Sequence, residues 1–172
     1  MNVFQKYILK QDVIIFDDFC MGGQLLLWAS RHWMKAFRKQ KVIAPCVWQS
    51  FAVPGLSSVY TELCELLRIM SFRELRADKF NRPDAIKLSA PEVLFMTILS
   101  KVQAGDLSGA INDLECIAPP AVAREIVERS SRIVFALQQA GHRVYHAIET
   151  EVDEAGNKNE QQFNVISSAT IH

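Results

Sequence analysis

The stretch from Leu88 to Gly105, LSAPEVLFMTILSKVQAG, constrains the fold of this chain more than any other. Ser89 and Glu92 have the S-x-x-E spacing of a capping box, in which the glutamate reaches back to the N–H of the serine. Pro91 suits the first turn of a helix, and Gly105 suits the residue that ends one. Apolar side chains cover most of the circumference between these ends. We therefore predict that residues 90–104 form the central, buried helix of a bundle.

Apolar residues at helical spacing predict further helices around it. A helix is expected from Asp17 or Asp18, as N-cap, to about Lys39, although Gly22 and Gly23 weaken its first turns or mark a later start. The other expected helices are one or two turns within 45–54, a helix from 57 or 58 to about 72, a short one capped by Asp106 or Ser108 and reaching Ile117, and a long one over 121–140.

The pattern changes after Gly141. Residues 144–152 alternate between two faces, residues 153–159 are rich in turn formers, and QQFNVIS follows as a second strand candidate. This order predicts a C-terminal β-hairpin, which residues 7–16 can join as a third strand in a small sheet. The predicted fold is mainly α, a single domain over 1–172 with a helical core over 17–141 and a hairpin or tail over 142–172.

The overall composition excludes several function classes. With 19 basic and 19 acidic side chains the chain has no net charge, and hence no global attraction to nucleic acid or anionic membrane. The apolar runs are shorter than the ~20 residues of a membrane span, and the N-terminus lacks the apolar run of a secretion signal. We therefore expect a cytoplasmic protein. Its four cysteines, Cys20, Cys46, Cys64 and Cys116, are expected to be reduced and buried.

One segment has a marked local charge. No acidic residue occurs from Phe19 to Thr61, and basic side chains gather within this range. Arg31, Lys35 and Arg38 have the spacing of one helix face. Such a face either keeps the helix soluble or binds a partner, a phosphate backbone or an anionic membrane. The predicted interaction surface consists of Trp28, Arg31, His32, Trp33, Lys35, Arg38 and Lys39.

Signals for catalysis and for cofactor binding are weak. His142 and His146 would be about 13 Å apart in a strand, too far for one metal ion. The sequence contains no H-E-x-x-H, no G-x-S-x-G and no phosphate-binding glycine loop. We therefore predict no catalytic residue, no metal and no cofactor.

Three functions remain open. The favoured one is a non-enzymatic helical interaction or regulatory module that binds a protein partner or a second copy of itself. The alternatives are a nucleic-acid-binding regulator that uses helix 28–41, and an enzyme with a cleft between the helices and the hairpin. A homodimer, with the hairpin or the basic helix in the contact, is expected for three reasons. Trp28 and Trp33 are about 140° apart on a helix, so one core face would hardly bury both. A two-stranded hairpin has unpaired edges, which proteins usually cover or pair, and the acidic residues 149–160 complement the basic helix.

Overall fold

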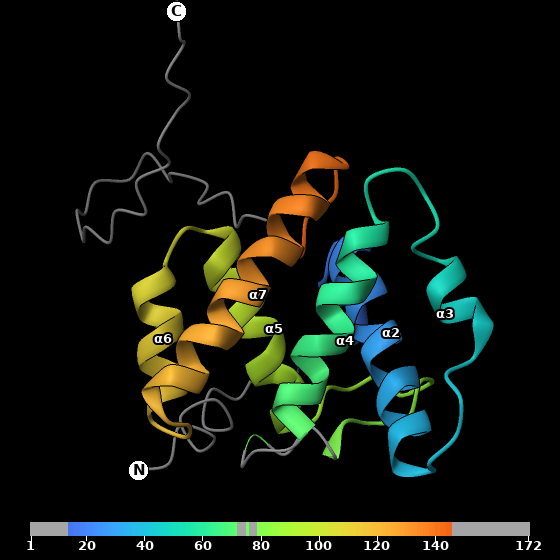
Figure 1. The fold of residues 1–172 in the computed structure, drawn as a ribbon, viewed down its shortest axis with the longest axis horizontal. Coiled ribbons are helices and arrows are strands. Elements are labelled where there is room, and N and C mark those ends of the chain that lie inside the picture. The colour runs from blue at the N-terminus through green and yellow to red at the C-terminus, as the bar shows by residue number, and fades with distance from the viewer. Residues whose placement is uncertain (1–13, 72–74, 76–78, 146–172) are drawn as a thin grey trace, which may run out of the picture.

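A computed structural model of the 172-residue chain describes residues 14–71, Leu75 and residues 79–145. This part of the chain is mainly α, as predicted, with a 3-10 turn and six α-helices and no strand beyond two isolated bridges (Figure 1). The elements are η1 (Phe16–Asp18), α2 (Met21–Arg38), α3 (Pro45–Gln49), α4 (Ser57–Ser71), α5 (Ala90–Gln103), α6 (Leu107–Glu115) and α7 (Pro120–Gln139).

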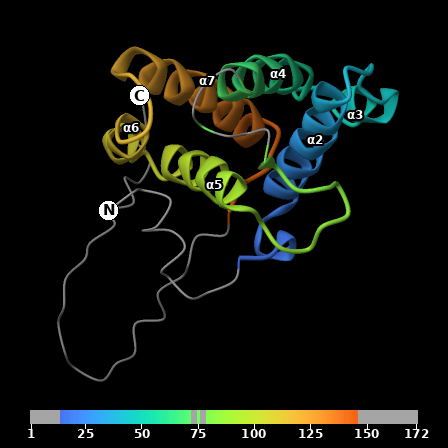
Figure 2. The ribbon, with the colours of Figure 1, turned by 90° about the horizontal axis from the view of Figure 1, so that it is seen from below.

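The helices pack in two layers around one apolar core. α7 packs against α4, α5 and α6, and α2 packs against α4 and α5. Seen from below, α4 and α7 form one layer, and α5 lies opposite them between α6 and α2 (Figure 2). The short helix α3 lies at the outer edge of the molecule beside α2 in both views.

Helix α5 is the buried element that the sequence predicts. Leu94 and Leu99 are almost completely buried, and α5 contacts α2, α6 and α7. The Glu92 carboxylate accepts from the N–H of Ser89 at 2.7 Å, as expected of a capping box. Gly105 follows the helix with φ of 80°, a left-handed conformation that favours glycine.

Helix α2 begins later than Asp17 or Asp18. These residues lie in η1, where the Asp18 carboxylate accepts from the N–H of Ile15 at 2.7 Å, and Cys20 is the N-cap of α2 instead. The later start places Gly22 and Gly23 in the first turn of α2.

These glycines allow a second chain segment to approach the helix closely. A Cβ atom on Gly23 would lie 2.2 Å from the carbonyl oxygen of Val144, and one on Gly22 would lie 2.6 Å from that of Arg143. Gln103 holds the same segment from the α5 side, since its amide accepts from the N–H of Val144 and donates to the carbonyl of Tyr145. Residues 142–145 therefore lie against the start of α2.

The predicted C-terminal hairpin lies mostly outside the described residues, because its residues 146–172 are not among them. Its first residues make a single antiparallel bridge, between Tyr145 and Phe19. Most of the proposed third strand, residues 7–13, is also outside the described part, and Ile15 pairs with Lys87 instead.

The expectation of buried cysteines is wrong for two of the four. Cys20 and Cys64 are half-buried, whereas Cys46 and Cys116 are exposed, and all four are free thiols. Cys46 lies in α3, where the neighbouring Val47 takes the inward position, and Cys116 is the C-cap residue of α6.

Candidate functional site

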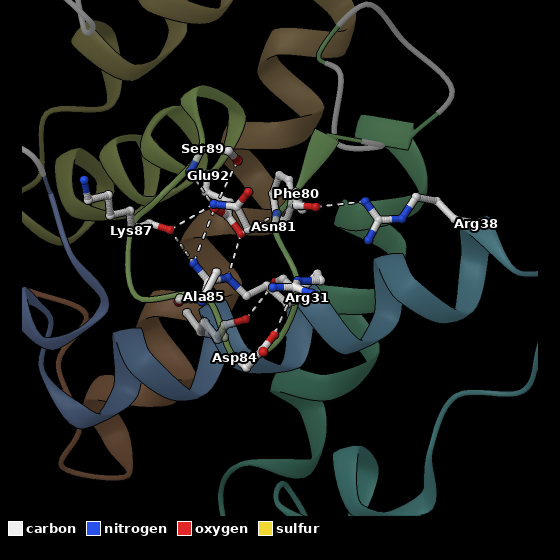
Figure 3. A network of polar contacts seen from close by, with 12 residues as sticks. Arg31, Arg38, Phe80, Asn81, Asp84, Ala85, Lys87, Ser89 and Glu92 are labelled. Atoms are coloured by element: carbon white, nitrogen blue, oxygen red, sulfur yellow. Dashed lines mark hydrogen bonds and ion pairs between the residues drawn. The ribbon is translucent and has the colours of Figure 1, made fainter.

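Arg31 does not belong to an exposed basic face. Its side chain and that of Glu92 are both completely buried, and Arg31 Nε lies 2.7 Å from Glu92 Oε1 (Figure 3). The guanidinium also donates to the backbone carbonyls of Ala85 and Lys87, and it lies 5.7 Å from the ring centroid of Phe16. Arg31 thus joins α2 to α5 and to the loop that precedes α5, and it must be removed from the predicted interaction surface.

Glu92 is the other centre of this network. Besides Arg31, its carboxylate accepts from the N–H of Asn81 at 3.0 Å, from the N–H of Ser89 and from the Ser89 hydroxyl. A buried charge is tolerated only when it is paired and hydrogen-bonded, and both conditions hold here. The network therefore has a structural role, fixing the 79–89 loop between two helices.

The two predicted tryptophans pack against the core of a single chain. Trp28 and Trp33 are both half-buried and both contact the apolar core. Trp28 lies against His32 with ring centroids 4.7 Å apart, and Trp33 stacks on Phe37 at 5.1 Å. The spacing of the tryptophans therefore gives no support to a dimer, and the charge argument for self-association remains a prediction.

His32 and Cys64 have shifted pKa values. Burial, followed by the charge of Lys35, lowers the pKa of His32, which favours the neutral imidazole. Burial raises the pKa of the Cys64 thiol, although its contacts with Tyr60 and Trp33 act in the opposite direction. A thiol with a raised pKa is a poor nucleophile at neutral pH, so this cluster does not resemble a catalytic one.

The remaining predicted cations differ in their surroundings. Arg38 donates to the carbonyl of Phe80 at 2.8 Å, so part of its hydrogen-bonding capacity is used within the chain. Lys35 and Lys39 are exposed one helical turn apart, and Lys41 is exposed shortly after the helix. Within the described residues, none of these three lysines forms an ion pair.

Sequence reasoning missed the exposed apolar side chains that follow these lysines. Val42, Trp48 and Val53 are 93%, 50% and 53% exposed, respectively. A tryptophan in a short segment between two prolines, within the acid-free range, was the available signal. We define the α2–α3 surface as the exposed side chains of Lys35, Lys39, Lys41, Val42, Trp48 and Val53.

The described part of the chain contains neither a cluster of metal ligands nor a membrane-spanning helix. In residues 14–71 and 79–145, no group of three or more His, Cys, Asp or Glu side chains is placed to hold a metal ion. No helix among the described residues is both long and apolar enough to cross a membrane.

The comparisons with known proteins give no family. No family model matches the chain, and neither a curated protein nor a solved structure is significantly similar to it. The α2–α3 surface is thus the candidate functional site on its physical properties alone.

Proposed function

We propose that the protein is a non-enzymatic helical module that binds an acidic segment of a partner protein through the α2–α3 surface. The observation that carries this proposal is that residues 35–53 combine three lysines without an acidic partner with the exposed apolar side chains of Val42, Trp48 and Val53. Protein interfaces are centred on aromatic and apolar side chains, tryptophan is a frequent hot spot, and surrounding charges favour a partner of the opposite sign.

The nucleic-acid alternative has less support. Binding to a phosphate backbone needs several cations, and each neutralised phosphate adds about 0.9 to the slope of log affinity against log salt. Arg31 is buried and paired with Glu92, so the basic helix offers one cation fewer than its sequence indicates, and Arg38 uses one of its donors on a backbone carbonyl. The exposed valines add nothing to phosphate binding, whereas they suit an apolar contact with a protein.

The enzyme alternative has no constellation of reactive groups in its favour among the described residues. Burial raises the pKa of Cys64, and burial together with Cys64 raises the pKa of Tyr60 to about 12. Both groups are therefore protonated at neutral pH. Neither group is thereby activated for nucleophilic or acid–base chemistry.

A direct binding experiment tests the proposal. A fluorescent peptide of about 15 residues, with alternating glutamate and leucine, and a labelled DNA duplex of about 20 base pairs are each titrated with the full chain by fluorescence anisotropy. We expect the peptide to bind. Both a Lys35→Gln/Lys39→Gln variant and a Trp48→Ala variant should bind it at least about fivefold more weakly, since a hot-spot side chain contributes more than about 1 kcal/mol.

The matched control neutralises two exposed cations elsewhere, in an Arg124→Gln/Lys87→Gln variant, and it should bind like the unmodified chain. Tighter binding of the duplex than of the peptide, lost in the Lys35→Gln/Lys39→Gln variant, would establish the nucleic-acid alternative instead. Equal peptide binding by all variants would show that the α2–α3 surface is not the binding site.

A further inference from the structure

We infer that the first occupant of the α2–α3 surface is the acidic segment 149–160 of the same chain, which a partner must displace. This inference rests on the proposed function, because it assigns a regulatory ligand to the same surface. The segment carries five acids and one lysine, Lys158. Its acids are Glu149, Glu151, Asp153, Glu154 and Glu160.

The charges of the described residues leave this surface as a target for acids. Arg68, Lys101, Arg129 and Arg132 each have a carboxylate within 4.0 Å. Among the described residues Lys87, Arg124 and Arg143 also lack such a partner, but they are far apart in the sequence, whereas three lysines without one fall within residues 35–41. Unpaired lysines close together repel one another, so an acidic segment placed beside them gains more than it would beside cations that are already paired.

The chain is long enough to make this contact within one molecule. Tyr145 is fixed beside Phe19 and Gln103, at the N-terminal end of α2. The 18 residues of α2 span about 27 Å at 1.5 Å per residue. An extended chain advances about 3.3 Å per residue, so about eight residues beyond Tyr145, near Asp153, suffice to reach the far end of α2. The acids between Glu151 and Glu160 are therefore within reach of Lys35 and Lys39.

The sequence of the segment matches both properties of the surface. Ile148, Thr150 and Val152 alternate with Glu149, Glu151 and Asp153. In an extended conformation the first set and the second set lie on opposite sides. Val152, seven residues beyond Tyr145, can extend about 23 Å from it, so it is the member of the apolar set that can approach the lysine end of α2, with Asp153 beside it. Tethering also gives the segment an effective concentration in the millimolar range, which favours it over the same segment of a second copy.

The reactivity of two exposed cysteines reports whether the α2–α3 surface is covered. Cys46 lies in α3, two residues before Trp48, whereas Cys116 lies at the end of α6, away from the α2–α3 surface (Figure 1). The rate of alkylation by iodoacetamide, an uncharged reagent, is followed at each cysteine by mass spectrometry of the full chain. The test variant neutralises the segment by Glu149→Gln, Glu151→Gln, Asp153→Asn and Glu154→Gln.

We expect Cys46 to react at least about fivefold faster in this variant. A segment that covers the α2–α3 surface about 80% of the time lets Cys46 react only during the remaining fifth, and neutralising the segment removes this protection. Cys116 should react equally in both proteins. Raising the salt from about 0.05 M to about 0.5 M should also accelerate Cys46 in the unmodified chain, since salt screens exposed charges. The matched control neutralises four exposed acids elsewhere, Asp17, Asp84, Glu125 and Glu128, and should leave the rate at Cys46 unchanged.

Equal rates at Cys46 in the two proteins would overturn the inference. Protection that grows between about 1 μM and about 100 μM protein would also overturn it, since a second copy would then be the occupant. Repeating the peptide titration on the neutralised variant separates the two proposals. Binding that still depends on Lys35, Lys39 and Trp48 would preserve the proposed function without the same-chain ligand, whereas loss of this dependence would remove both.

Discussion

The buried pair of Arg31 and Glu92 supports a quantitative prediction. Replacing Arg31 by Met leaves the Glu92 carboxylate buried without a cation, with only Ser89 and the N–H of Asn81 as donors. Breaking a buried ion pair from one side costs about 3–5 kcal/mol. Because three donors remain, we expect Arg31→Met to lower the free energy of unfolding by about 3 kcal/mol. Glu92→Gln should cost about 4 kcal/mol, since no other carboxylate of the described residues is bonded to the guanidinium.

The double replacement Arg31→Met/Glu92→Met should cost about 4 kcal/mol, well below the sum of the two single effects. It buries no charge, but the N–H groups of Asn81 and Ser89 and the carbonyls of Ala85 and Lys87 lose their partners, at about 0.5–1.5 kcal/mol each. The resulting coupling energy is about 3 kcal/mol.

Urea denaturation followed by circular dichroism measures all three values. The control is Glu65→Gln, which breaks a surface pair with side chains 55% and 42% exposed and should change stability by less than about 0.5 kcal/mol. Losses below about 1 kcal/mol for both single variants, or strictly additive effects in the double variant, would refute the view that this pair is a buried and coupled unit.

Three further predictions concern the core, the glycine contact and pH. Leu94→Ala and Leu99→Ala should each cost about 2–5 kcal/mol in urea denaturation, through lost burial and a cavity, and near-neutral effects at both would mean that α5 is not central. Gly23→Ala should cost about 2–3 kcal/mol in the same assay, because its Cβ would meet the backbone oxygen of Val144, which cannot move without displacing residues 142–145; an unchanged midpoint would contradict this close contact. The lowered pKa of His32 means that the unfolded chain takes up a proton first as the pH falls below 6.5, so stability should decline between about pH 7 and pH 5; His32→Gln should reduce this decline, and an identical pH profile would show that His32 does not contribute.

The helical framework was determined by the sequence itself, because its signals are local. The capping box of Ser89 and Glu92, the apolar stripe of α7 and the glycines at positions 105 and 141 act within a few residues. Such signals need no knowledge of distant segments, and they placed α4, α5 and α7 within one or two residues of their observed bounds. The start of α2 was misplaced, because Asp18 bonds backward to Ile15 and not forward into the helix.

The composition of the candidate site was decided by tertiary structure. Arg31, Lys35 and Arg38 have the spacing of one basic helix face, yet Arg31 is buried because Glu92, 61 residues away, supplies a charge and the 85–87 loop supplies carbonyls. Trp33 is half-buried against the core, where the Cys64 thiol of α4 contacts it, despite its angular separation from Trp28. Whether a polar or aromatic side chain faces solvent depends on the partners that the fold brings to it, and those partners are set by contacts between segments far apart in the sequence.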